Sequence, residues 1–160
     1  MKAQVFTMDF IISIILFMSM MIMISILWST LTIDLESKKS FDDMMFQALS
    51  TSELLVKDGG NPTNWTTSVF YSLGLAESEN VLEWRKISYF VELVLNDYSS
   101  VKDVLGLSDD FYFELYDLTN STTIVSAPLI SLESYDNVAA VNRIVLVNNS
   151  LARFSFAIVR

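Results

Sequence analysis

The feature that most constrains this chain is an apolar run from Phe10 to Ile33, which contains no charged residue, no proline and no glycine. As an α-helix that rises about 1.5 Å per residue, the run would be roughly 36 Å long. The hydrocarbon core of a bilayer is about 30 Å thick, so a helix of this length can cross it with some tilt. We therefore expect a membrane-spanning helix here.

Two other interpretations of the run fit less well. A cleavable secretory signal has an apolar region of only about 7 to 15 residues that ends in small residues. Here the run continues through Trp28 and Leu31, with no such cleavage site behind it. A fully buried helix of a soluble protein would need other elements on every side, which is a heavy demand on a chain of 160 residues.

The rest of the chain has the composition of one globular domain with an acidic surface. The chain has 19 acidic and 10 basic residues, and every acid except Asp9 follows the apolar run. Such a surface repels nucleic acid, so we expect no nucleic-acid partner. There is no cysteine and no histidine. Because the usual zinc ligands, nucleophile pairs and general base are missing, we expect no metal, no cofactor, no catalytic residue and no enzyme activity.

We divide the chain into three parts: a leader and cytoplasmic tail over 1–9, a transmembrane or assembly helix over 10–33, and an exported head over 34–160. Lys2 precedes the apolar run, but Lys38 and Lys39 follow it, so flanking positive charge does not decide the orientation. Length favours a short cytoplasmic N-terminus and a large exported part. The expected localisation is therefore the cell membrane, with one span, a cytoplasmic N-terminus and an extracellular head.

A helical pattern continues beyond the apolar run. Small or apolar residues recur at alternating spacings of four and three: Phe41, Met45, Ala48, Ser52 and Leu55. Glu36, Asp43 and Glu53 lie on the other face. The pattern predicts one helix from about Thr7 to Lys57, ended by Asp58-Gly59-Gly60. Its lower half is apolar all round, and its upper half, which belongs to the head, is amphipathic.

The sequence of the head predicts an α+β fold. In this fold the long helix packs on an antiparallel sheet of about four strands, with one or two extra helices. A second helix is expected over Glu83 to Asn96, and a third, capped by Ser99-Ser100, ends before Gly106. Four runs rich in β-branched and aromatic residues predict the strands: Phe111 to Leu118, Thr122 to Ser131, Val138 to Val147 and Leu151 to Val159. Asn148-Asn149 predicts a tight hairpin between the last two.

The N-terminus resembles that of archaeal type IV pilin-like (pseudopilin-like) proteins. Lys2-Ala3-Gln4 is followed by VFTMDF and the apolar helix. The head is also similar to a recurring archaeal pilin-like head, through short motifs in the order GGNPTNW, LGLA, NVL, VKDVLGL and DFYFEL. The resemblance spans most of the chain.

The resemblance implies processing and assembly roles for three residues. In that family a prepilin peptidase cuts after a basic and a small residue, which matches Lys2-Ala3 before Gln4. An acid at the fifth mature position neutralises the new amino terminus of a neighbouring subunit. Cleavage after Ala3 makes Asp9 the sixth residue, and cleavage after Gln4 makes it the fifth. Without the resemblance, Asp9 marks the membrane interface or caps the helix, or it pairs with a cation among apolar helices.

Three sites fit the N-glycosylation acceptor Asn-x-Ser/Thr, at Asn64, Asn120 and Asn148. All three lie in expected loops or turns of the exported part. Modification and ordinary turn chemistry account for them about equally well, because Asn is favoured in turns.

These observations lead to two expectations about function. The first is a structural subunit, major or minor, of an archaeal type IV pilus-like surface filament that serves adhesion or surface assembly. Its partners would be membrane lipid, copies of itself or related pilin-like subunits, the prepilin peptidase and the assembly machinery. The second is a monomeric single-pass anchor that displays an extracellular binding domain. An anchor has no need of Asp9 or of the sequence Lys2-Ala3-Gln4, so the N-terminus discriminates between the two.

Overall fold

The computed structural model describes residues 2–128 and 134–160, without the side chains of residues 2–7, 34, 36 and 37. It confirms the coarse α+β class, with a long N-terminal helix and a sheet. The chain divides into two compact units, Met1–Ser40 and Phe41–Arg160, which we describe in turn.

The first unit is formed by the long helix α1, which runs over Lys2–Lys57 and continues into the second unit. The prediction of one long helix is confirmed, although it begins closer to the N-terminus than Thr7. The helix contains no proline or glycine that would interrupt it. It ends at Lys57 as expected, where the backbone N–H of Asp58 donates to the carbonyl oxygen of Leu54 at 2.9 Å.

Within the second unit, α1 buries a stripe that differs from the predicted one. Its buried side chains are Met44, Ala48, Thr51, Ser52, Leu55 and Val56. Phe41 and Met45 were expected on this stripe, but they are 40% and 36% exposed. Met44, Ala48 and Leu55 recur at helical spacing, so the stripe passes through Met44 instead of Met45. The prediction was wrong here because two apolar neighbours satisfy the same periodicity.

The sheet of the second unit has six strands among the described residues, in the order β1-β2-β5-β6-β3-β4. The prediction of about four antiparallel strands was therefore wrong. It missed β1 (Ala76–Ser78) and β2 (Val81–Leu82), which are too short to show an alternating pattern. The sheet is also mixed, because β2 pairs in parallel with β5, with Val81 opposite Leu146.

The four longer strands are β3 (Asp110–Asp117), β4 (Thr122–Ala127), β5 (Val138–Val147) and β6 (Ser150–Val159). Buried residues alternate along β3 as expected. The strand predicted from Thr122 to Ser131 ends at Ala127, before Pro128, and its positions 129–131 lie outside the described residues. The hairpin is confirmed, since Asn148 and Asn149 have φ values of 49° and 65°.

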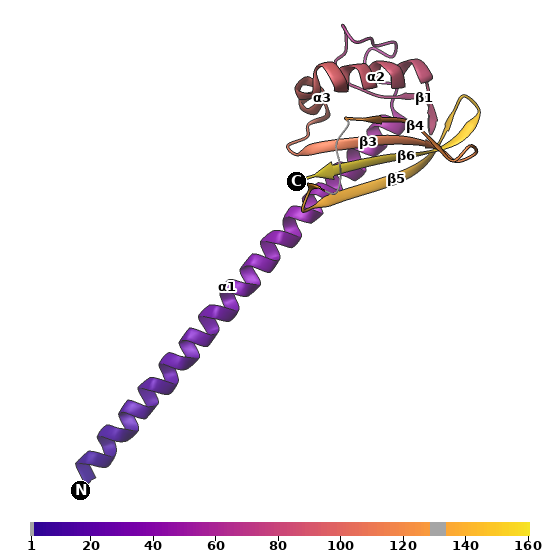
Figure 1. Ribbon diagram of the computed structural model, residues 1–160. Coiled ribbons are helices and arrows are strands. Elements are labelled where there is room, and N and C mark those ends of the chain that lie inside the picture. The colour runs from indigo at the N-terminus through magenta and orange to yellow at the C-terminus, as the bar shows by residue number, and fades with distance from the viewer. Residues whose placement is uncertain (1, 129–133) are drawn as a thin grey trace. The chain divides into compact units, whose positions relative to one another are not determined.

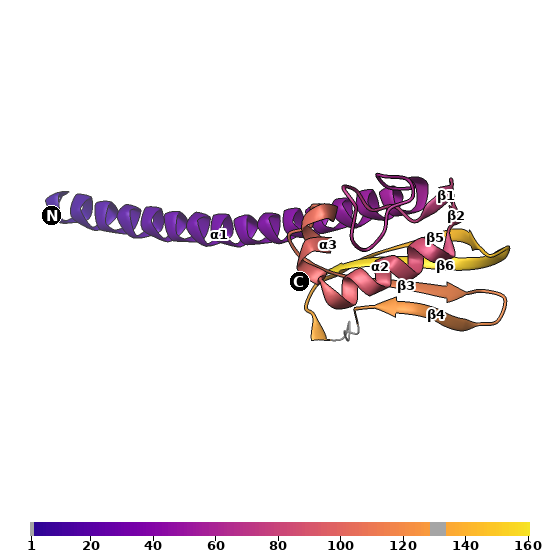
Figure 2. The same cartoon turned by 90° about the horizontal axis from the view of Figure 1, so that it is seen from above.

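Two short helices cover one face of this sheet. Helix α2 (Trp84–Asn96) matches the prediction; it lies above the strands in Figure 1 and across them in Figure 2. Helix α3 (Tyr98–Leu105) ends at Gly106, which has a φ of 69°. Its predicted cap was wrong: Asp97 caps the helix, because its side chain accepts a hydrogen bond from the backbone N–H of Ser100.

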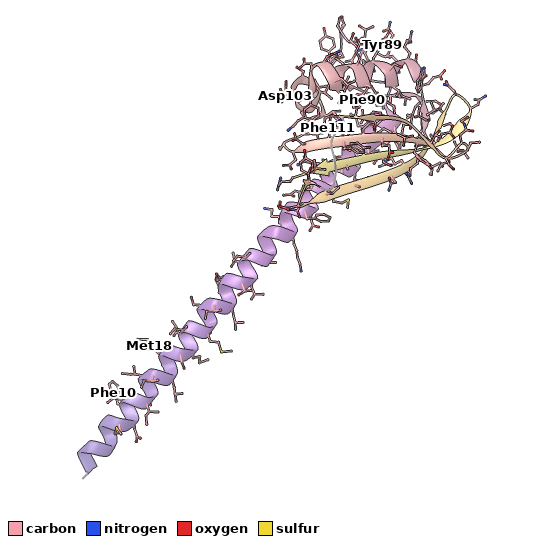
Figure 3. All side chains as sticks on the ribbon, viewed as in Figure 1. Phe10, Met18, Tyr89, Phe90, Asp103 and Phe111 are labelled. Carbon is pink, nitrogen blue, oxygen red and sulfur yellow. The ribbon has the colours of Figure 1, made fainter. Side chains whose placement is uncertain are left out.

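Aromatic rings fill the core between α2 and the sheet. Phe90 of α2 points toward the strands, and Phe111 of β3 points back toward it (Figure 3). The ring centroids of Phe90 and Phe113 are 5.3 Å apart, and those of Phe111 and Phe156 are 5.5 Å apart. All four rings are fully buried. These rings hold β3 and β6 against α2. Helices α2 and α3 do not cover the opposite face of the sheet.

Candidate functional site

The apolar part of α1 has no protein covering. Every described side chain from Met8 to Ile33 is exposed, including Phe10 at 60% and Met18 at 58% (Figure 3). Within the described residues, one helix is long and apolar enough to cross a membrane, and none of its apolar window is buried. A soluble protein rarely exposes an apolar surface of this extent, so the segment is suited to lipid or to other apolar helices.

Four hydroxyl groups of this segment donate hydrogen bonds inside the helix. Ser13 and Thr30 each donate to the carbonyl oxygen four residues earlier, at 2.8 and 2.9 Å. Ser19 and Thr32 also donate to backbone carbonyls, both at 2.8 Å. Polar groups in hydrocarbon must find such partners, because no water is present there. The segment can therefore leave water without losing a hydrogen bond at these positions.

The predicted processing residues Ala3 and Gln4 lie in the first turns of α1, and their side chains are outside those described. Asp9 is exposed, and its carbonyl oxygen accepts the hydrogen bond from Ser13. Among the described side chains, no ion pair is recorded for Asp9. The structure thus leaves its carboxylate accessible to a partner outside the chain.

The three glycosylation candidates lie in loops and turns. Asn64 is exposed in the loop after α1, and Asn148 is exposed at the first position of the β5–β6 hairpin. The side chain of Asn120, in the β3–β4 turn, donates from Nδ2 to Oδ2 of Asp117 at 2.8 Å. That nitrogen is the atom that a glycan would occupy, so the folded turn competes with modification at Asn120.

Asp117 organises the β3–β4 turn. Besides the side chain of Asn120, the backbone N–H groups of Thr119 and Asn120 donate to its carboxylate, at 2.7 and 3.1 Å. These hydrogen bonds, chiefly those from Asn120, hold the pKa of Asp117 below its ordinary value. The turn lies at the start of β6, where Asp117 pairs with Ala152, next to the β5–β6 hairpin.

A shallow cavity of about 390 Å³ lies where β1, the start of α2 and the β5–β6 hairpin meet. Glu77 lines it from β1, Trp84 from α2, and Asn148 and Asn149 from the hairpin. Trp84 is 44% exposed. A partly exposed indole beside amide and carboxylate groups suits a small polar ligand with an apolar face. The sequence prediction missed this cavity because it depends on two strands that left no periodic signal.

Two of the charged residues that line the cavity, Glu83 and Arg85, pair with each other, and the nearby Lys86 also approaches Glu83. Arg85 Nη2 lies 2.6 Å from Glu83 Oε1. Lys86 is buried, and its Nζ donates to the carbonyl oxygen of Ala76 at 2.8 Å and lies 3.5 Å from Glu83 Oε2. Lys86 therefore ties α2 to β1. Among the described residues, no group of three or more metal-ligating side chains occurs.

Comparison with known proteins adds no family: no family model, no curated protein and no solved structure matches the chain. The fold and the surfaces define only a class, an α+β head combined with an apolar helix of membrane-spanning length. A function must therefore be argued from the residues themselves.

Proposed function

We propose that this protein is a structural subunit of an archaeal type IV pilus-like surface filament, and not an enzyme. The proposal rests on a single observation, the two different surfaces of helix α1. Its apolar part is exposed on all sides, four of its hydroxyls donate hydrogen bonds inside the helix, and the same helix supplies a buried stripe to the head. Such a helix can move from lipid into a bundle of identical helices without losing the hydrogen bonds of these four hydroxyls.

In this proposal the N-terminus is cytoplasmic and the head is exported. The prepilin peptidase trims the chain at Ala3 or Gln4, and the assembly machinery transfers the apolar helix from the membrane into the filament. The carboxylate of Asp9 then pairs with the new amino terminus of a neighbouring subunit. This pairing would compensate the cost of placing an acid among apolar helices.

The experiment that tests the proposal is intact mass and N-terminal sequencing of the protein from sheared cell-surface material and from membranes. We expect a chain that begins at Gln4 or Val5 in the sheared fraction. Asp9→Ala should abolish recovery in that fraction, because the neighbouring amino terminus loses its partner. Asp103→Ala, a change of an exposed acid on α3, is the matched control and should leave recovery unchanged.

A chain that keeps Met1 or Lys2 and occurs only in membranes would contradict the filament proposal. So would full recovery of the Asp9→Ala variant from sheared material.

The cavity favours a second candidate, a single-pass anchored domain that binds a small polar ligand. Its exposed indole and amide groups have no role in the filament proposal. Binding of methyl β-D-glucoside, which has an apolar face and several hydroxyls, would be measured by NMR on the full chain in a sugar-free detergent. This candidate requires binding that Trp84→Ala abolishes and that Tyr71→Ala, a change of another exposed aromatic residue, leaves intact.

A further inference from the structure

The uncovered face of the sheet carries an exposed apolar cluster around one arginine. Ile144, Leu146 and Leu151 are 57%, 39% and 51% exposed. The register places Leu146 opposite Leu151, Ile144 opposite Arg153, and Arg153 opposite Tyr116. Directly opposed residues share a face and touch, so these side chains form one continuous surface. We name these five residues the sheet patch.

Arg153 is the charged centre of the sheet patch and lacks a carboxylate partner among the described residues. Its guanidinium carbon lies 4.9 Å from the centre of the Tyr116 ring, which holds the side chain in place. Its Nε atom is buried without a hydrogen-bond partner. The chain as a whole has a net charge of −9. An arginine presented in this way suits a partner that brings a carboxylate and an apolar side chain.

A second surface of the same unit has that chemistry. On the outer face of α1, Phe46 and Leu49 are 71% and 47% exposed. Asp42 lies one turn before Phe46, and Glu53 one turn after Leu49, so a carboxylate flanks the apolar centre on each side. Glu53 pairs with Lys57 at 2.7 Å, whereas no ion pair is recorded for Asp42 among the described residues. We name these four residues the stem stripe.

We propose that the sheet patch of one copy docks on the stem stripe of the next copy, with Arg153 facing Asp42. The apolar side chains of the two surfaces then contact each other, and Arg153 contacts Asp42, an acid without an ion pair among the described residues. Because the two surfaces differ, the contact is heterologous. Repeating a heterologous contact gives an open helical array when the rotation that relates one copy to the next does not produce a closed ring. This inference rests on the proposed filament function. Membrane anchoring would assist it by raising the effective concentration of the copies.

The absence of cysteine from the chain permits a direct test by disulfide cross-linking. The full-length variant with both Ile144→Cys and Phe46→Cys is oxidised mildly in its cell membranes and in sheared material. We expect a ladder of disulfide-linked oligomers, because each chain then carries one cysteine on each docking surface. Either single variant should give no ladder. A chain with Tyr71→Cys and Phe46→Cys is the control, because Tyr71 is exposed but lies outside both surfaces.

Charge reversal tests the central pair. In the double-cysteine chain, Arg153→Glu should reduce the ladder at least about tenfold, because two acids then face each other. Adding Asp42→Arg should restore it, whereas Asp103→Arg should not. Restoration by the reciprocal change also shows that the loss is not a failure to fold.

The cross-linking and filament results test the docking contact and the filament function separately. Filaments without a ladder would overturn the docking contact and leave the filament function standing. Absence of both would overturn both. A ladder without filaments would support the contact and overturn the filament function. Strong dimers from either single variant would mean that a surface meets its own copy, which contradicts a heterologous contact.

Discussion

Gly74 occupies a position at which no other residue fits. A Cβ atom there would overlap the backbone of Asp58 and of Gly60, where the loop that follows α1 folds back against the end of the helix. The Nε1 of Trp65 donates to the carbonyl oxygen of Gly74 at 2.8 Å and so holds this part of the loop in place. Gly106 differs, because it has a φ of 69° but open space around the missing Cβ.

The two glycines should therefore respond differently to alanine. Gly74→Ala must displace backbone atoms, and we expect it to lower the free energy of unfolding by about 3 kcal/mol or more. Gly106→Ala forces alanine into the left-handed conformation at the end of α3 but causes no clash. We expect it to lower the free energy of unfolding by about 1 kcal/mol. Urea unfolding of the full chain in detergent, followed by tryptophan fluorescence, measures both. Equal losses would contradict the crowding at Gly74.

Arg143 joins the sheet to α1 within the second unit. From β5 its Nε donates to Ser52 Oγ at 3.0 Å, and its Nη2 donates to the carbonyl oxygen of Leu49 at 3.3 Å. Ser52 is fully buried. The arginine therefore satisfies polar groups at the boundary between α1 and β5.

Replacing Arg143 by alanine should lower the free energy of unfolding by about 1 to 2 kcal/mol, because charge-assisted hydrogen bonds are lost at a partly buried site. Arg85→Ala is the matched control. Its ion pair with Glu83 lies on a side chain that is 60% exposed, and exposed pairs contribute about 0.5 kcal/mol or less. Thermal unfolding of both variants decides the matter. A larger loss for Arg85→Ala would show that Arg143 does not stabilise the contact between α1 and β5.

At the scale of elements, the β3–β4 turn depends on one ionised carboxylate. Asp117 accepts hydrogen bonds from two backbone N–H groups and from the side chain of Asn120. Only the ionised carboxylate can accept all of them, which is why the pKa of Asp117 lies below its ordinary value. These hydrogen bonds are therefore strongest while this group remains ionised.

This lowered pKa predicts a dependence of stability on pH. The contribution of Asp117 is complete above the ordinary aspartate pKa of about 3.9, and it is lost as the pH falls through the lower folded value. Between about pH 6 and pH 3, the native protein should therefore lose more stability than Asp117→Asn. Asn120→Ala, which removes one donor, should lie between them. Melting temperatures across this range are the measurement, and parallel curves for all three proteins would contradict the assignment.

At the scale of the whole molecule, the two units have different sources of stability. Every core residue in the described part of the chain lies at or beyond Met44, and none of them belongs to the apolar run. The first unit is a helix whose described side chains from Met8 to Ile33 are all exposed. A helix without tertiary contacts depends on its surroundings, and here an apolar environment is required.

A chain that starts at Phe41 should therefore fold by itself. We expect a cooperative thermal transition within a few degrees of that of the full chain, because no core contact is removed. The truncated chain should also remain in the soluble fraction, whereas the full chain sediments with membranes. A broad, non-cooperative transition would mean that the apolar segment contributes to the core.

The sequence alone determined the elements whose signal is local. An uninterrupted apolar run predicted α1, and alternation predicted the buried face of β3. Paired asparagines predicted the β5–β6 hairpin, and the sequence also located the candidate residues Ala3, Gln4, Asp9, Asn64, Asn120 and Asn148. These features depend on periodicity, backbone conformation and short motifs, which a linear pattern carries.

Only the tertiary structure decided how these elements meet. Strand β2 forms because β5 supplies its backbone partners, and β1 forms because it pairs with β2. Strands of two or three residues contain no period to detect. The choice of Met44 over Met45 for the buried stripe depended on where the head contacts α1. Packing between distant segments produces three further features: the cavity beside Trp84, the position of Arg153 over the Tyr116 ring and the exposure of Phe46. Burial and pairing are properties of the folded chain, so no local pattern could specify them.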